Sequence, residues 1–272
     1  MHALAGIAGS IAAPIGRGLV DFLSSTGRVL SFAVPAVRGA LSTREGLRAC
    51  ASQASTISLR CAVPVALVTG PVGAMLALQA LTLMRTFGVE RQLAPLCVAT
   101  IVRELAPGFA AVVVAMQGGA GIAAELGAMR NNAELDALEV MGADPRASIA
   151  GPRIVGAALA APIMNALAIG SGVLGAFIMA VVILGVPRAL FMETALLGIG
   201  VLDVWVSEAK SAVFGAGLGA VCATAGFFAP LGPAGVGRAA NRAVVASVIL
   251  VLFANYLVNT AVFGLKGGAV PS

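Results

Sequence analysis

Residues 123–145 read AAELGAMRNNAELDALEVMGADP and form the most acidic stretch of the chain. They hold five of its twelve Asp and Glu residues, namely Glu125, Glu134, Asp136, Glu139 and Asp144. Long apolar runs without charge lie on both sides of this stretch. A polar connector between such runs is typical of a chain that crosses a membrane repeatedly. The stretch therefore predicts a loop outside the bilayer that joins two spans.

The composition of the chain indicates the same surroundings. Of the 272 residues, 59% are hydrophobic and only 11% are charged, whereas soluble domains carry about 25% charged residues. The 34 glycines suit membrane helices that approach one another closely. A soluble all-α core, the alternative, would need five successive buried helices and almost no polar surface. We therefore expect an all-α polytopic membrane protein.

Intervals without charge locate the spans, because a membrane helix needs about 20 predominantly apolar residues. The third interval is long enough for a span and an extension beyond the membrane. In the first, Pro64 and the pair Gly70-Pro71 predict a kinked or broken helix and, with it, a cavity. The five intervals are Cys61–Met84, Leu105–Ala124, Ile154–Pro187, Ser211–Gly237 and Ala243–Leu265.

The N-terminal segment has two faces at helical spacing. Arg17, Asp21, Ser24 and Arg28 share one face, and apolar residues occupy the other: Leu19, Phe22, Leu23, Val29 and Leu30. This pattern predicts an amphipathic helix in the membrane interface, the alternative being a soluble helix packed on the rest of the protein. No Lys or Arg precedes Arg17, whereas a secretory signal opens with basic residues, so we expect the N-terminus to be retained.

The basic residues predict the orientation. With the N-terminus in the cytoplasm and five spans, most arginines fall inside, as the positive-inside rule requires. The acidic stretch then lies in a cytoplasmic loop between spans two and three. The basic residues are scattered singly, which argues against nucleic-acid binding. Those predicted to be inside are Arg17, Arg28, Arg38, Arg44, Arg48, Arg60, Arg130, Arg146, Arg153, Arg238 and Arg242.

A short helix is predicted within this loop. Asn131 followed by Glu134 resembles a capping box, while Gly142 and Pro145 end the helix after about ten residues. Leu135, Leu138 and Met141 share one face, and Asp136 and Glu139 lie on the opposite side. The pattern fits a helix that docks on a partner and equally fits a solvated connector.

Four ordered motifs between about residue 50 and the end of the chain resemble a known family. The run ELGAMRNNAELDALEVMGADP, followed by Pro152-Arg153, resembles the signature of the MlaE/YrbE permeases. These are membrane subunits of bacterial ABC transporters that work with MCE-domain lipid-binding proteins. The stretches RELAP (103–107), KSAVFG (210–215) and GVGRAANRAVV (235–245) resemble three further motifs of that family.

Two positions depart from the family pattern. Where the family usually has Gly-Arg-x-Gly-Ser before the acidic loop, this chain has MQGGA at 116–120, so the basic residue is missing. Ala240 and Asn241 stand where a Thr commonly follows the GVG motif. Roles that depend on that arginine or that hydroxyl do not transfer to this chain.

The resemblance implies that the loop helix is a coupling helix seated in a groove of a separate ATPase subunit. The residues implied in ATPase coupling are Glu134, Leu135, Asp136, Leu138, Glu139, Met141, Gly142 and Asp144. It also implies a lipid cavity at a dimer interface, for which Arg103, Glu104 and Gln117 are the candidates. The cargo would be lipid, with phospholipid favoured.

The remaining implied partners are a second permease subunit, identical or paralogous, and an MCE-domain assembly. The location would be a bacterial inner membrane. ATP and Mg²⁺ would belong to the ATPase, because a P-loop needs Gly-Lys followed by Ser or Thr, and the two lysines, Lys210 and Lys266, follow Ala209 and Leu265. No cofactor, metal site or catalytic residue is expected in this chain, since the four cysteines show no CxxC spacing and the single histidine is His2.

Two other classes of function stay open at this point. A secondary transporter or channel would need ionisable residues at mid-span, and mid-span positions are almost free of charge. A membrane scaffold that moves no cargo would have the same apolar spans. We expect residues 1–50 to form the interfacial segment and residues 51–272 the permease domain, with the coupling loop at about 126–152.

Overall fold

The computed structural model describes residue 24 and residues 26–260, and the regular structure in this part of the chain is helical throughout. Five helical spans are long and apolar enough to cross a membrane. Their bounds are Arg44–Phe87, Glu90–Asn131, Arg146–Ile183, Val201–Phe227 and Pro233–Asn259. The prediction of an all-α membrane protein with five spans is therefore confirmed, and the protein is a multi-pass membrane protein.

The first span is the single helix α2, Arg44–Phe87. It continues through Pro64 and Pro71, so of the predicted kink or break at these residues the break is wrong and the kink stays a prediction. Gly70 and Gly73 serve close packing instead: a methyl group on Gly73 would lie 2.0 Å from the carbonyl oxygen of Gly172 on the third span. The helix backbones touch here because glycine has no side chain to separate them. The expected domain boundary after residue 50 falls inside α2.

The second span is a helix with two π-helical stretches in which the backbone takes one extra residue per turn. These stretches carry all three predicted lipid-cavity residues, and π-bulges are frequent at functional sites. The elements in order are η1 (Glu90–Gln92), α3 (Leu93–Thr100), η2 (Ile101–Leu105), α4 (Ala106–Val114), η3 (Ala115–Gly119) and α5 (Ala120–Asn131). Arg103 and Glu104 lie in η2, and Gln117 lies in η3.

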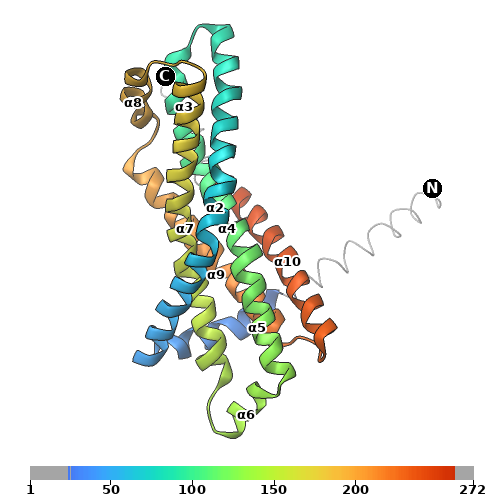
Figure 1. Cartoon of the computed structure of the whole chain (residues 1–272). Helices are drawn as coiled ribbons and strands as arrows, with labels where there is room; N and C mark the ends of the chain where they lie inside the picture. Colours follow the sequence, from blue (N-terminus) through green and yellow to red (C-terminus); the bar gives the residue numbers. More distant parts are fainter. Residues whose placement is uncertain (1–23, 25, 261–272) are drawn as a thin grey trace, which may run out of the picture.

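The rest of the described chain alternates long spans with short elements at the two ends of the bundle (Figure 1). The short loop helix α6 lies at one end and α8 at the other. The elements are α6 (Glu134–Val140), η4 (Arg146–Ala150), α7 (Gly151–Phe177), η5 (Ile178–Ile183), α8 (Arg188–Ala195), η6 (Leu196–Gly198), α9 (Val201–Phe227) and α10 (Pro233–Asn259). We refer below to the α6 end and the α8 end of the molecule.

All five spans begin earlier than the charge-free intervals predicted, and the fourth and fifth show why. α9 starts at Val201 and includes Asp203, Glu208 and Lys210, while α10 starts at Pro233 and includes Arg238 and Arg242. The turn between them, residues 228–232, carries no charge, so the interval Ser211–Gly237 ran through it. Charge marked the ends of these two spans poorly because charged side chains lie within the helices.

Residues 26–41 form a helix that runs across the bundle near its α6 end instead of along the spans (Figure 1). Its inner face is buried, and the Phe32 ring contacts the rings of Phe227 and Phe228 at centroid distances of 5.0 and 5.5 Å. Leu30 and Val34 remain exposed. The transverse course agrees with an interfacial helix, and the rest of the chain covers part of its apolar surface. Five residues of the predicted faces, Arg17, Leu19, Asp21, Phe22 and Leu23, lie outside the described residues.

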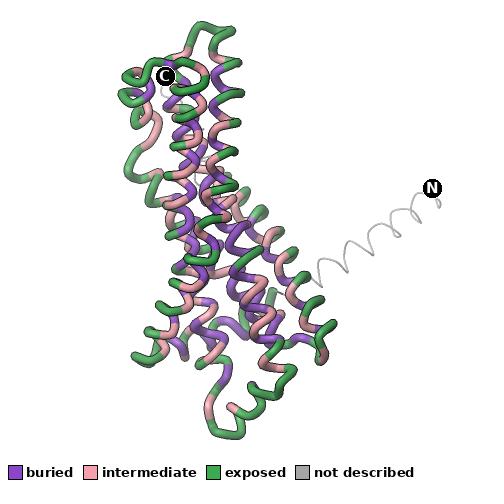
Figure 2. Tube along the Cα trace, viewed as in Figure 1, coloured by how far each residue is buried: buried purple, intermediate pink, exposed green. Residues whose placement is uncertain are grey.

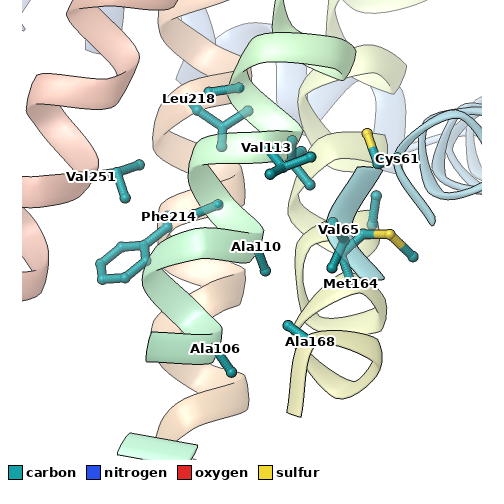
Figure 3. Close-up of a cluster of buried hydrophobic side chains, with 14 of the residues drawn as sticks. Cys61, Val65, Ala106, Ala110, Val113, Met164, Ala168, Phe214, Leu218 and Val251 are labelled. Atoms are coloured by element: carbon teal, nitrogen blue, oxygen red, sulfur yellow. The ribbon is translucent and has the colours of Figure 1, made fainter. Parts of the chain in front are cut away.

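The core lies along the inward sides of the spans, with α4 in the middle (Figures 2 and 3). Ala106 and Ala110 of α4 are fully buried, and Phe214 and Leu218 of α9 pack beside them. Small residues on α4 let its neighbours approach closely, which compensates for the lack of a hydrophobic driving force between helices in lipid. Large apolar side chains on the outer faces, such as Leu67 and Ile249, are exposed.

Candidate functional site

The acidic loop contains the predicted short helix, but it begins differently from the prediction. α6 spans Glu134–Val140 and starts after Ala133, which adopts a left-handed backbone conformation with φ of 57°. The predicted capping box at Asn131 is wrong, because the Asn131 side chain accepts a hydrogen bond from the backbone N–H of Gly232 at 2.7 Å. The end of α5 is thereby fastened to the turn between α9 and α10.

One face of α6 packs on the rest of the chain, and the other is exposed. Leu135 is 3% exposed and belongs to the core, so it anchors α6 to its own chain. At the opposite extreme Val140 is 89% and Met141 72% exposed. Leu138 is intermediate, and the four predicted acids, Glu134, Asp136, Glu139 and Asp144, are all exposed. The helix therefore presents an apolar tip surrounded by carboxylates, and Val140, which the sequence analysis did not select, is part of that tip.

The turn after α6 is built by Gly142 and Asp144. Gly142 has φ of 81°, a conformation that favours glycine, and its N–H donates to the Glu139 carbonyl at 3.0 Å. Asp144 Oδ1 accepts from the backbone N–H of Arg146 at 2.9 Å and so caps the first turn of the third span. A shallow groove of about 380 Å³ is lined by these residues and by Glu139.

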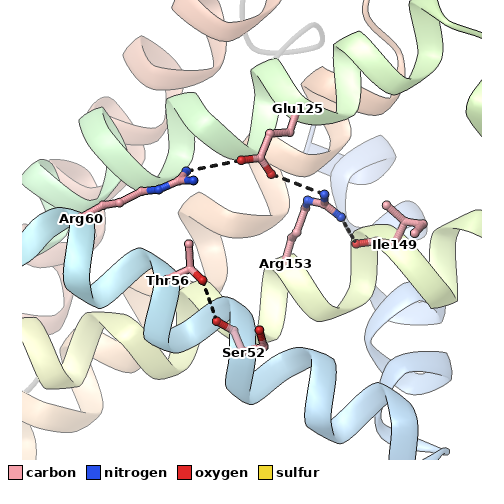
Figure 4. A network of polar contacts seen from close by, with 6 residues as sticks. All are labelled: Ser52, Thr56, Arg60, Glu125, Ile149 and Arg153. Carbon is pink, nitrogen blue, oxygen red and sulfur yellow. Dashed lines mark hydrogen bonds and ion pairs between the residues drawn. The ribbon is translucent and has the colours of Figure 1, made fainter.

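Two residues of α5, the helix that precedes α6, attach it to neighbouring spans. Arg130 donates to the Phe227 carbonyl at 2.7 Å, at the end of α9. One helical turn earlier, Glu125 bridges two arginines (Figure 4): Arg60 of α2 at 3.3 Å and Arg153 of α7 at 3.4 Å. Arg153 also donates to the Ile149 carbonyl at 3.0 Å. Through these contacts, a displacement of α6 and α5 would also displace the first, third and fourth spans.

A second group of polar residues lies where α9 begins and α10 ends, toward the α8 end. Arg103 Nη2 pairs with Asp203 Oδ2 at 2.9 Å, and Asp203 also accepts from the Gly200 N–H at 2.9 Å. Arg103 thus pairs with a residue of a neighbouring helix. We call the residues Arg103, Glu104, Asp203, Lys210 and Asn259 the polar cluster.

Lys210 and Asn259 complete this cluster. Lys210 is only 3% exposed; its ammonium group donates to the Arg103 carbonyl at 2.8 Å and to Asn259 Oδ1 at 2.5 Å. The Asn259 amide in turn donates to Glu104. Two positive and two negative side chains from the second and fourth spans are therefore joined in one network through Asn259 of the fifth span. Such pairing offsets the high cost of charge at membrane depth.

The structure brings Arg103 and Glu104 together but keeps Gln117 apart from them. Gln117 is exposed on the same span, about 20 Å further along at 1.5 Å per residue. Sequence reasoning missed Asp203, Lys210 and Asn259 as members of the site. The available signal was Lys210, a lysine at the edge of an apolar interval, whereas nothing local to Asn259 marks it.

Comparison with known proteins places the chain in a family. The model of the family described as Permease MlaE matches residues 50–261. A probable ABC transporter permease protein of Rickettsia conorii is 32% identical over 254 residues, which cover 93% of this chain and 98% of that protein. The intermembrane phospholipid transport system permease protein MlaE of Haemophilus influenzae is 24% identical over 251 residues, which cover 92% of this chain and 96% of that protein.

A similarity over a shorter part of the chain extends to plants. Protein TRIGALACTOSYLDIACYLGLYCEROL 1, a chloroplastic protein of Arabidopsis thaliana, is 28% identical over 199 residues, which cover 73% of this chain and 57% of that protein. The family model covers well over half of the chain, and its match includes α6 and the polar cluster. This chain belongs to the MlaE permease family.

Proposed function

We propose that this chain is the membrane permease subunit of an ABC transporter that moves phospholipid between bacterial membranes. The observation that carries the proposal is α6: a family member with five spans presents an exposed apolar tip ringed by acids at one end of its bundle. A separate ATPase subunit would receive this tip in an apolar pocket with a basic rim. ATP and Mg²⁺ are assigned to that subunit.

In this proposal the residues of α6 have different tasks. Leu138, Val140 and Met141 form the grip, and Glu134, Asp136, Glu139 and Asp144 set its orientation on the partner. Leu135 holds α6 on its own chain, so that a force applied to the tip by the ATPase would move the rest of the chain. Gly142 ends the helix and leaves Met141 at the tip. Glu125, between Arg60 and Arg153, and Arg130 carry the displacement from α5 to three other spans.

The polar cluster supports a lipid as cargo. Arg103 has a side chain that is 38% exposed beside the buried Lys210. The Arg103 guanidinium at that position, with apolar spans extending from it toward the α6 end, suits an amphiphile with a phosphate headgroup. We propose that Arg103 and Glu104 face the lipid cavity near its mouth. Gln117, deeper along the same span, would face the acyl chains.

The proposed assembly has further members. A second permease subunit would close the cavity, and an MCE-domain assembly would exchange lipid with it at the α8 end. The α6 end would face the cytoplasm of a bacterial inner membrane, with the N-terminus on the same side. The excess of arginines near that end supports this orientation.

The test is transport in proteoliposomes that contain this chain, its ATPase and its MCE partner. Labelled phosphatidylethanolamine should leave or enter the vesicles only with hydrolysable ATP. Movement driven by an ion gradient without the ATPase would favour a secondary transporter and overturn the proposal. Absence of lipid movement, together with purified complex free of bound lipid by mass spectrometry, would favour a scaffold.

A further inference from the structure

A groove of about 830 Å³ lies at the α6 end, between the transverse helix 26–41, α9 and α10. It is separate from the polar cluster: Arg242, on its rim, and Asn259, in the cluster, lie about 25 Å apart along α10 at 1.5 Å per residue. The groove plays no part in the ATPase coupling proposed above. The apolar residues in its walls include Val221, Phe228 and Ala246.

Three arginines line this groove: Arg28, Arg146 and Arg242. Among residue 24 and residues 26–260, which the structure describes, no acidic residue lines it. In the part of the chain that the structure describes, Arg146 and Arg242 form no ion pair with a carboxylate. The guanidinium of Arg146 lies 5.9 Å from the centre of the Phe32 ring, and the nearby Asp144 takes its hydrogen bond from the Arg146 backbone N–H. The groove consequently has an excess of positive charge.

Beyond Arg242, the surface of α10 next to the groove carries apolar side chains. One to three turns beyond Arg242 on the same helical stripe lie Ala246, which lines the groove, and then Ile249 and Phe253, which are 60% and 59% exposed. This stripe faces outward on a helix that spans the membrane. An occupant of the groove can thus place an anionic group among the arginines and hydrocarbon chains against α10.

We infer that this groove binds the headgroup of an anionic bilayer phospholipid, with its acyl chains along Ile249 and Phe253. Arginine suits this role because its planar guanidinium donates paired hydrogen bonds to phosphate oxygens. Basic pockets between membrane helices on the cytoplasmic side are suited to anionic lipid headgroups. The proposed orientation, with the α6 end toward the cytoplasm, decides only that the bound lipid belongs to the cytoplasmic leaflet. Lipid bound here bridges the transverse helix to α9 and α10 and holds them together.

The experiment uses the purified full chain in a zwitterionic detergent. Dioleoyl-phosphatidylglycerol or dioleoyl-phosphatidylcholine is titrated in, and bound lipid is counted by native mass spectrometry. The first phosphatidylglycerol should bind the Arg146→Gln/Arg242→Gln double variant roughly 10- to 30-fold more weakly than the unaltered chain. Phosphatidylcholine should bind both alike. Size-exclusion profiles and thermal unfolding show whether the variant is folded, and Arg146→Lys/Arg242→Lys, which keeps the charge, should retain most of the affinity.

Arg238→Gln is the matched control, because Arg238 is exposed one turn before Arg242 but does not line the groove. Its affinity should stay within about twofold of the unaltered chain. Equal loss in this control would reduce the effect to general surface charge and overturn the inference. Displacement of the lipid by millimolar inorganic phosphate would identify a site for a free anion instead.

A last arm tests whether a second copy of the chain fills the groove. The four cysteines of the chain are buried, so an Ala246→Cys variant introduces an accessible thiol at the groove. Oxidation in native membranes should leave this variant monomeric on a denaturing gel. A disulfide-linked dimer would show that the groove faces another copy, and it would overturn the lipid assignment.

Discussion

The acidic loop and the polar cluster contain similar side chains but use them in opposite ways. In the cluster, Lys210 is buried, and its ammonium group contacts groups from two other spans. On α6, Asp136 and Glu139 are exposed, and within the described residues neither takes part in an ion pair. The chain pairs its own charges where lipid surrounds it and leaves them available where water does.

The physical reason is the cost of a bare charge in each solvent. An unpaired ion at membrane depth costs several kcal/mol, whereas an exposed carboxylate in water costs almost nothing. Charges on α6 can therefore be kept for a soluble partner.

Lys210→Ala should have the largest effect. It removes one partner of a buried network and leaves Glu104 and Asn259 without their cation, which should lower the free energy of unfolding by about 3–5 kcal/mol. Unfolding of the purified chain in mixed detergent micelles measures this. Arg188→Ala, at an exposed residue of α8, is the control and should change stability by less than about 0.5 kcal/mol. Similar effects in the two variants would contradict the cluster's role.

Leu135→Ala should come next. It leaves a cavity under α6 and should lower the stability of that helix by about 2 kcal/mol, the low end for such a change because α6 packs on one side only. Hydrogen exchange of the amides of Glu134–Val140 reports this local opening. Met141→Ala, at the exposed tip, should leave that exchange almost unchanged. If both variants accelerate it equally, α6 has no distinct anchored face.

The Glu125 network should contribute less. The Arg60 and Glu125 side chains are 57% and 43% exposed, so Glu125→Gln should cost at most about 1 kcal/mol, and less at high salt. Double-mutant cycles divide the effect between the two arginines. The Arg153 pair should show the larger coupling energy, because its arginine is 13% exposed. A larger coupling for the Arg60 pair would contradict this ranking by burial.

Neutralising the acids of α6 should have the smallest effect. Asp136→Asn and Glu139→Gln should leave the free energy of unfolding within about 0.5 kcal/mol of the unaltered chain. The same unfolding assay applies. A loss comparable to that of Lys210→Ala would mean that these carboxylates have structural partners and are not available to another protein.

The sequence predicted the number of spans well because the five apolar runs are long and uninterrupted. It predicted the ends of α9 less well, since Asp203 and Lys210 lie inside a helix where partners on other spans compensate their charge. Arg103 and Asp203 are separated by 100 residues, and Lys210 and Asn259 by 49. No local pattern reveals such pairs.

The loop helix shows a similar division. Helical spacing put Leu135, Leu138 and Met141 on one side of α6, but spacing alone does not tell which of them faces the chain's own core. The fold decides this by burying Leu135 and leaving Met141 outside, beside Val140. The start of α6 was missed because Asn131 satisfies a distant backbone N–H on the α9–α10 turn.

The most direct test of the central claim is co-purification of this chain with its ATPase, using a tag on one of them. Met141→Asp and Leu138→Asp should abolish the association while membrane insertion and stability remain. Leu196→Asp is the matched control, because Leu196 at the α8 end is 71% exposed, close to the 72% of Met141. Association that survives both α6 variants, or is lost equally in the control, would contradict the account of α6 as the site where the ATPase acts.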